Sequence, residues 1–190
     1  MNSEIYVACY GDSLIEGFPF SPKYSWIAIA EGINGINMLN YGLCGDCTDD
    51  ILYRMRQYPV PEFVHHVIFL GGANDVIQGR SIKSIIPVLD RVYAWSRENN
   101  YELCFVLPFI STESVLNRSL IELREKMVER YSDKAFLLDL QPAIGLTPGE
   151  RYKAYVDGVH PKSATYEAMG KYAAPFIEEW VKGKNKTEAK

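Results

Sequence analysis

Five short apolar segments alternate along the chain with longer segments of helical periodicity, and this alternation restricts the fold more than any other feature. The apolar segments span residues 4–10, 36–41, 64–70, 103–107 and 135–140. Runs of this length predict strands that are buried on both faces. Strands that alternate with helices form a parallel sheet through right-handed crossovers. The sequence therefore predicts an α/β fold in which helices cover both faces of one sheet.

The segments between the strands carry apolar residues on one helical face. The residues of this face in segment 114–131 follow steps of four, three, four and four: Leu116, Leu120, Leu123, Met127 and Tyr131. A second stripe predicts a helix over residues 84–99, with Pro87 in the first turn, where its missing N–H is tolerated. Further helices are predicted over residues 24–32, 49–57 and 163–182.

The arrangement expected from this order is a three-layer α/β/α sandwich with a flavodoxin-like five-stranded parallel sheet of order 2-1-3-4-5. In that order, the loops after the first and third strands leave the sheet side by side, where ligands usually bind. A chain of 190 residues suits one domain, and no repeat or composition break divides it. We predict a single domain over residues 1–182 and a polar tail over residues 183–190.

Charge and composition narrow the class of function. The chain has 20 Lys and Arg against 24 Asp and Glu, so its net charge of −4 is opposite to that of a nucleic-acid binder. No apolar run reaches the roughly 18 residues of a membrane span, and the first residues lack the pattern of a signal peptide. Four cysteines in such a chain predict reduced thiols. We expect a cytoplasmic protein with a small-molecule partner; the sequence carries no signal for an oligomeric state.

Three turns after the first three strands carry polar groups suited to catalysis. Gly-Asp-Ser-Leu at residues 11–14 presents a serine hydroxyl at the carboxyl end of the first strand. A turn serine by itself is more often a helix cap. Residues 40–46 (Asn-Tyr-Gly-Leu-Cys-Gly-Asp) and 71–75 (Gly-Gly-Ala-Asn-Asp) are glycine-rich turns with backbone or amide donors. The three turns together favour a catalytic site over three separate caps.

A fourth block, Asp157-Gly158-Val159-His160, places a carboxylate three residues before an imidazole. This spacing lets the carboxylate turn back and orient the ring. The preceding connection is unusually long, since residues 141–160 separate the fifth strand from the histidine. The fifth strand lies three strand spacings, about 14 Å, from the first. The length therefore suits a segment that carries Asp157 and His160 back to Ser13.

These four blocks, in this order, resemble the GDSL, or SGNH, family of serine esterases and acylhydrolases over nearly the whole chain. The resemblance implies the SGNH hydrolase fold, with Ser13 as nucleophile, His160 as base and Asp157 as the residue that orients His160. It implies two oxyanion donors, the Asn74 side-chain amide and a glycine N–H of the second block. Either Gly42 or Gly45 can supply that N–H; Gly45 is preferred because Gly-Asp-x-Thr at residues 45–48 matches the family block better. The implied mechanism needs neither a metal nor an organic cofactor.

The expected activity is hydrolysis of carboxylic esters with short acyl chains, because no segment is left over to form a lid. A thioesterase or a carbohydrate deacetylase needs the same residues. Two alternatives come from other classes: a binding module on this fold, and a thiol redox protein that uses Cys44 and Cys47, whose spacing is Cys-x-x-Cys. One departure from the family pattern is the Ile15-Glu16 pair, where many members carry small polar residues.

Several apolar residues follow the strands on the expected active-site side and either line an acyl pocket or only cover the core: Phe18, Phe20, Val76, Ile77, Phe109 and Ile110. Tyr152 and Tyr155 either close the site or anchor the long segment. His65 and His66 lie at the opposite end of the third strand, so we expect them to be structural.

Overall fold

The computed structural model describes residues 4–58 and 60–183, so the predicted tail falls outside the described residues from position 184 onward. Its sheet consists of five parallel strands: β1 (Tyr6–Gly11), β2 (Asn37–Gly42), β3 (His66–Leu70), β4 (Glu102–Val106) and β5 (Phe136–Leu138). Their order is β2-β1-β3-β4-β5. The predicted order is confirmed.

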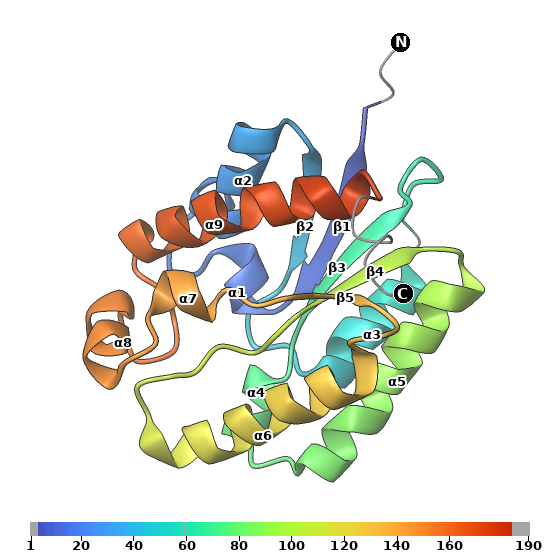
Figure 1. Ribbon diagram of the computed structural model, residues 1–190. Coiled ribbons are helices and arrows are strands. Elements are labelled where there is room, and N and C mark those ends of the chain that lie inside the picture. The colour runs from blue at the N-terminus through green and yellow to red at the C-terminus, as the bar shows by residue number, and fades with distance from the viewer. Residues whose placement is uncertain (1–3, 59, 184–190) are drawn as a thin grey trace.

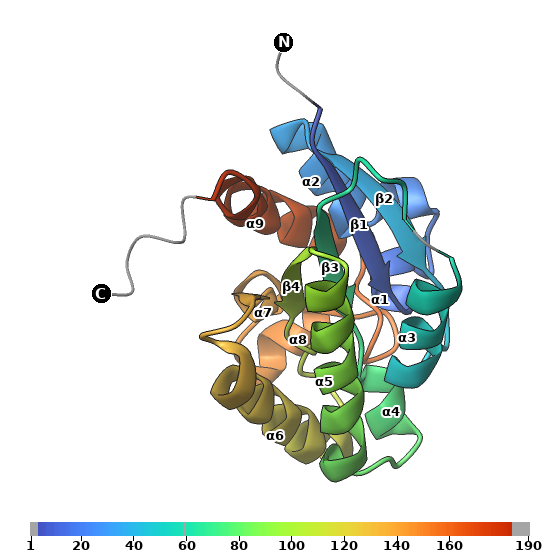
Figure 2. The same ribbon diagram turned by 90° about the vertical axis from the view of Figure 1, so that its right-hand side faces the viewer.

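Helices cover both faces of this sheet. The elements between and after the strands are α1 (Ser13–Glu16), η1 (Pro22–Tyr24), α2 (Trp26–Asn34), α3 (Thr48–Gln57), α4 (Ala73–Ile77), α5 (Ile82–Glu98), α6 (Ser114–Tyr131), α7 (Gln141–Ile144), α8 (Pro148–Ala154) and α9 (Ser163–Val181). Figures 1 and 2 show α2 and α9 side by side on one face, and α3, α5 and α6 on the other. The α/β/α sandwich is confirmed, and none of the described helices is long and apolar enough to cross a membrane.

The core is centred on the three inner strands. Val7, Ala8 and Cys9 of β1, like Val67 and Ile68 of β3, have no exposed surface. The edge strands differ, since most residues of β2 and two of the three residues of β5 are only partly buried. The prediction that every strand is buried on both faces is therefore wrong for β2 and β5. An edge strand has a neighbour on one side only, and the helix layers cover it less completely.

The helices follow the predicted stripes closely, and α6 has the predicted bounds. Helix α5 begins at Ile82, two residues before the predicted start, so Pro87 lies beyond the first turn. Because proline has no N–H, the Lys83 carbonyl, four residues earlier, lacks its usual hydrogen bond within the helix. The long connection after β5 contains two short helices, α7 and α8, that the sequence analysis did not predict. Helix α8 starts with a capping box, in which Thr147 and Glu150 each accept a hydrogen bond from the backbone N–H of the other.

Candidate active site

The first strand leads directly into a tight turn that carries Ser13, which is 6% exposed. Helix α1 begins at Ser13, and the Asp12 carboxylate caps it by accepting a hydrogen bond from the Leu14 N–H at 2.9 Å. The turn needs glycine before it, because a Cβ on Gly11 would lie 2.4 Å from the Ile15 side chain and 2.6 Å from the Leu70 carbonyl oxygen. The sequence Gly-Asp-Ser-Leu thus places a serine hydroxyl at the carboxyl edge of the sheet, where α1 and α4 lie (Figure 1).

The structure brings Ser13, His160 and Asp157 into one line of contacts. Ser13 Oγ lies 3.0 Å from His160 Nε2, and His160 Nδ1 lies 2.7 Å from Asp157 Oδ2. The other carboxylate oxygen of Asp157 accepts hydrogen bonds from the backbone N–H groups of Val159 and His160, at 3.1 and 2.8 Å. This arrangement leaves Nε2 free of the proton when Nδ1 donates to Asp157, which is the tautomer that a base toward Ser13 requires.

The environment of Asp157 keeps its carboxylate ionised. Partial burial raises the pKa of Asp157, but the hydrogen bonds from the His160 backbone and imidazole and from Val159 outweigh it and leave the pKa below its usual value. An ionised carboxylate accepts from Nδ1 and stabilises the imidazolium that forms when His160 takes a proton.

Contacts around the long segment hold His160 in place. The Tyr155 hydroxyl donates to the Ile110 carbonyl at 2.8 Å, and the Val156 N–H donates to the carbonyl of His160 at 2.8 Å. On the other side, the Phe18 ring meets the His160 ring edge to face with a centroid distance of 4.7 Å. Of the two tyrosines considered from the sequence, Tyr155 anchors the segment, whereas Tyr152 is 79% exposed.

The second block forms a turn that requires glycine at position 45. The Asp46 N–H donates to the Leu43 carbonyl at 3.3 Å, and Gly45 has a φ of +86° at the third position of this turn. The Gly42 N–H already donates to the Asn40 side chain at 2.9 Å. Gly45 is therefore the more suitable of the two candidate donors.

The third block places Asn74 beside this turn. The Asn74 side-chain amide donates to the Asp46 carbonyl at 2.9 Å and lies 3.5 Å from the Asp12 carboxylate. Since an amide nitrogen carries two hydrogens, the bond to Asp46 orients the group without using both of them. The structure thus brings all five predicted site residues to the same edge of the sheet.

Asp75, next in sequence, is fully buried and connects two loops. It accepts hydrogen bonds from the Thr48 N–H and hydroxyl, both at 2.9 Å, and from the Arg80 guanidinium at 3.1 Å. Asp75 therefore joins the turn that carries Asn74 to the start of α3 and has a structural role.

Comparisons with known proteins agree with this geometry. The model of the GDSL-like lipase/acylhydrolase family matches residues 9–168. The chain belongs to this family. It is thus a carboxylic-ester hydrolase, and the fold matches those of solved GDSL proteins. The comparison with curated protein sequences gave no match.

Three solved structures illustrate the similarity of this GDSL-family chain. A protein of Desulfitobacterium hafniense, described as lipolytic and of the G-D-S-L family, has 21% identity and a TM-score of 0.78, covering 90% of this chain and 99% of its own. A G-D-S-L lipolytic protein of Veillonella parvula has 19% identity and a TM-score of 0.79, covering 90% and 97%. The psychrotrophic esterase EstA of a Pseudoalteromonas species has 17% identity and a TM-score of 0.75, covering 94% and 100%.

Cys44 and Cys47, in the loop between β2 and α3, lack the environment of a redox pair. Cys44 is exposed and Cys47 is buried, and both are free thiols. Desolvation raises the pKa of Cys44 to about 12 and that of Cys47 to about 11, with nearby carboxylates adding to the effect. A redox thiol needs a lowered pKa, because the thiolate is the reactive form.

A small apolar cavity of about 10 Å³ lies next to the site. Three of its lining residues, Leu14, Ala73 and Val159, are the direct sequence neighbours of Ser13, Asn74 and His160. Ile77 and Phe109, which the sequence suggested for an acyl pocket, also line it. By contrast, the suggested residues Phe18 and Phe20 are 42% and 37% exposed and do not belong to its lining.

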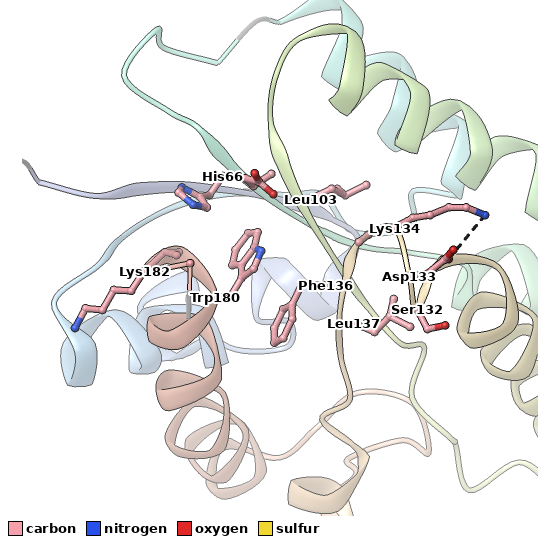
Figure 3. A pocket seen from close by; sticks show the side chains of 13 residues that line it. His66, Leu103, Ser132, Asp133, Lys134, Phe136, Leu137, Trp180 and Lys182 are labelled. Carbon is pink, nitrogen blue, oxygen red and sulfur yellow. Dashed lines mark ion pairs between the residues drawn. The ribbon is translucent and has the colours of Figure 1, made fainter. Parts of the chain in front are cut away.

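A much larger hollow of about 670 Å³ lies at the opposite end of the sheet. Figure 3 shows Trp180 between His66 and Phe136, with ring centroids 5.1 and 5.9 Å away. His66 and Glu102 begin β3 and β4, so this hollow is at the amino edge, away from Ser13. The larger of these two hollows is therefore not the one beside the candidate site. His66 lies away from the site, as expected from the sequence.

The sequence analysis missed two side chains that contact the turn of residues 43–46. The Glu16 carboxylate accepts a hydrogen bond from the Cys44 N–H at 2.8 Å, so the departure from the family pattern at this position contacts the turn directly. Arg54 of α3 contacts the turn through Asp46. One feature of the sequence could have indicated this contact. Arg54 lies three residues after the buried Ile51, so its charged side chain is beside the buried face of α3.

Proposed function

We propose that the protein cleaves esters through an acyl-enzyme on Ser13, with His160 as the base and Asp157 as the residue that orients it. The observation that supports this most directly is the line of contacts from Ser13 Oγ to His160 Nε2, at 3.0 Å, and from His160 Nδ1 to Asp157, at 2.7 Å. A serine hydroxyl is a weak nucleophile at neutral pH, so a base within hydrogen-bond distance is needed to take its proton during attack.

The first step forms the bond between Ser13 Oγ and the acyl carbon while His160 takes the hydroxyl proton. The carbonyl oxygen becomes an oxyanion, which the Gly45 N–H and the Asn74 amide stabilise; the Ser13 N–H is a third donor. Donors that are already oriented contribute about 3 to 4 kcal/mol each to such a transition state. His160 then gives its proton to the leaving alcohol. Water attacks the acyl-enzyme in the second step, again with His160 as base, and releases the acid.

The proposed substrates are esters of short acyl chains. The cavity beside the site holds about 10 Å³, the space of one water molecule, and it is lined mainly by apolar side chains. A cavity of this size admits a group about as large as a methyl, such as that of an acetyl ester, whereas a longer chain must lie across the surface around Ile77, which is 47% exposed. A thioester with a short acyl group suits the same residues, so the substrate panel includes both.

The Ser13→Ala variant tests the mechanism. We expect it to lose nearly all turnover of 4-nitrophenyl acetate while it keeps the wild-type circular dichroism spectrum. The Ser132→Ala variant is the matched control, since Ser132 is exposed near the amino-edge hollow. Mass spectrometry of the wild-type protein during turnover should find the added acyl mass on the peptide that contains Ser13. Wild-type rates in a folded Ser13→Ala protein would refute the acyl-enzyme.

Acyl specificity is tested with acetyl, butyryl, octanoyl and palmitoyl esters and with acetyl and butyryl thioesters. We expect kcat/KM to fall from butyryl to palmitoyl at matched soluble concentrations. The Ile77→Ala variant should raise the octanoyl rate relative to the acetyl rate, because it opens one wall of the cavity. Ile33→Ala is the control, since Ile33 is similarly exposed, at 54%, on the distant helix α2. Faster hydrolysis of the palmitoyl than of the butyryl ester by the wild-type protein contradicts the short-chain preference.

A further inference from the structure

We propose that Arg54 is the positioning residue of the oxyanion site: its guanidinium holds together the three backbone segments on which the donors of the site depend. This inference rests on the proposed function of Ser13, Gly45 and Asn74. Arg54 itself touches no reacting atom in this scheme and acts only through the groups that it binds.

The contacts of Arg54 come from three different segments. Its Nε donates to the Asp46 carboxylate at 2.7 Å, its Nη1 to the Tyr41 carbonyl at 2.9 Å and its Nη2 to the Gly11 carbonyl at 2.9 Å. Gly11 ends β1 and Tyr41 lies near the end of β2, whereas Asp46 belongs to the turn of residues 43–46 that carries Gly45, the proposed oxyanion turn. One side chain on α3 therefore connects the ends of two strands to the turn between β2 and α3.

Two of these contacts, those with Gly11 and Asp46, lie within two residues of a proposed donor in the sequence. Gly11 precedes the Asp12-Ser13 turn, and its carbonyl also accepts the Leu43 N–H at 3.0 Å, which brings the start of the oxyanion turn to the same point. Asp46 follows Gly45 directly, so the bond to Arg54 restrains the peptide that carries the Gly45 donor. The backbone carbonyl of the same Asp46 orients the Asn74 amide.

The burial and charge of the pair suit this role. The side chains of Arg54 and Asp46 are 19% and 12% exposed, so their ion pair is largely shielded from water. Hydrogen bonds between charged partners are shorter and stronger than neutral ones. The planar guanidinium has five N–H donors in a fixed geometry, which lets it bind a carboxylate and two carbonyls at once. A lysine ammonium at the end of a flexible chain does not present donors in that fixed arrangement.

The test compares three variants of the full chain with the wild type. Arg54→Met removes the guanidinium, Arg54→Lys keeps the charge, and Arg54→Met combined with Asp46→Asn avoids an unpaired buried carboxylate. We expect Arg54→Met and the double variant to lower kcat for 4-nitrophenyl acetate by about 10- to 100-fold, less than the roughly 10²- to 10³-fold for loss of a donor. KM should change by less than about threefold, because misplaced oxyanion donors weaken mainly the transition state. Arg54→Lys should fall between the wild type and Arg54→Met.

Arg124→Met is the matched control. Arg124 of α6 also binds a carbonyl, that of Pro108 at 2.8 Å, and a carboxylate, that of Asp139 at 2.6 Å, and it is 16% exposed. Its removal should lower the melting temperature as Arg54→Met does but leave kcat within about threefold of the wild type.

Three results overturn the proposal. The first is a kcat within threefold of the wild type in every Arg54 variant that folds. The second is a loss confined to KM, and the third is an equal loss of kcat in Arg124→Met. These results differ from failure of the proposed function, which is judged by Ser13→Ala. If Ser13→Ala is inactive and the Arg54 variants keep the wild-type kcat, only the role of Arg54 is refuted.

Discussion

Replacing Asn74 with alanine separates stabilisation of the transition state from stabilisation of the fold. In the folded protein the Asn74 amide makes one short hydrogen bond, to the Asp46 carbonyl at 2.9 Å, and a long contact of 3.5 Å with Asp12. Loss of one such bond lowers the free energy of unfolding by about 1 kcal/mol. For a protein of this size, that corresponds to a decrease in the melting temperature of about 2 to 4 °C.

The expected effect on catalysis is much larger. An amide that donates to the oxyanion contributes about 2.7 to 4 kcal/mol to the transition state, so its loss should lower kcat by about 10²- to 10³-fold. Both acylation and deacylation pass through an oxyanion, and kcat therefore falls whichever step is slower. KM should change little, because the ground-state carbonyl is bound only weakly by the same donor.

The assay measures kcat and KM for 4-nitrophenyl acetate together with the melting temperature. Asn99→Ala is the control, because the Asn99 amide also donates to one backbone carbonyl, that of Trp95 at 2.8 Å, far along the chain from the site. Asn99→Ala should lower the free energy of unfolding by a similar amount and leave kcat unchanged. If Asn74→Ala retains the wild-type kcat and raises KM alone, Asn74 binds the ground state and the assignment as an oxyanion donor is wrong.

Three further predictions concern two aspartates and the thiols. Asp157→Asn should lower the plateau of kcat/KM, because the His160 ring loses the carboxylate that fixes its tautomer; an unchanged plateau contradicts this role. Burial raises the pKa of Asp12 to about 7, so the folded state holds the proton of this carboxyl group more tightly than the unfolded state does. The stability that this proton contributes is therefore lost as pH rises from about 4 through 7. Asp12→Asn should therefore gain stability relative to the wild type, on the order of 3 kcal/mol, between pH 4.5 and pH 8 in urea unfolding, and a constant difference refutes it. Cys44→Ser combined with Cys47→Ala should keep kcat within several-fold; insulin disulfide reduction that the wild type shows and this variant loses would instead favour the redox alternative.

The strands and long helices follow from the sequence because their signals are local. The five apolar runs predicted five strands, and the stripe from Leu116 to Tyr131 predicted the bounds of α6. The short helices α7 and α8 were missed because four and seven residues are too few for a periodic pattern, and the start of α8 depends on the Thr147 and Glu150 caps instead. The incomplete burial of β2 and β5 depends on their place at the sheet edges, which a run of apolar residues does not encode.

The sequence by itself determined the fold class, the family and the candidate site residues, because these depend on local periodicity and on four short blocks. The sequence also preferred Gly45 to Gly42 as the candidate donor, and the bond from the Gly42 N–H to Asn40, two residues away, supports that preference. Only the tertiary structure decided the contacts of Arg54, whose guanidinium binds carbonyls 43 and 13 residues away. Those carbonyls lie within reach of one guanidinium because parallel pairing sets the ends of β1 and β2 side by side, with Gly11 opposite Gly42. A hydrogen bond between groups so distant in sequence exists only once the sheet has brought them together.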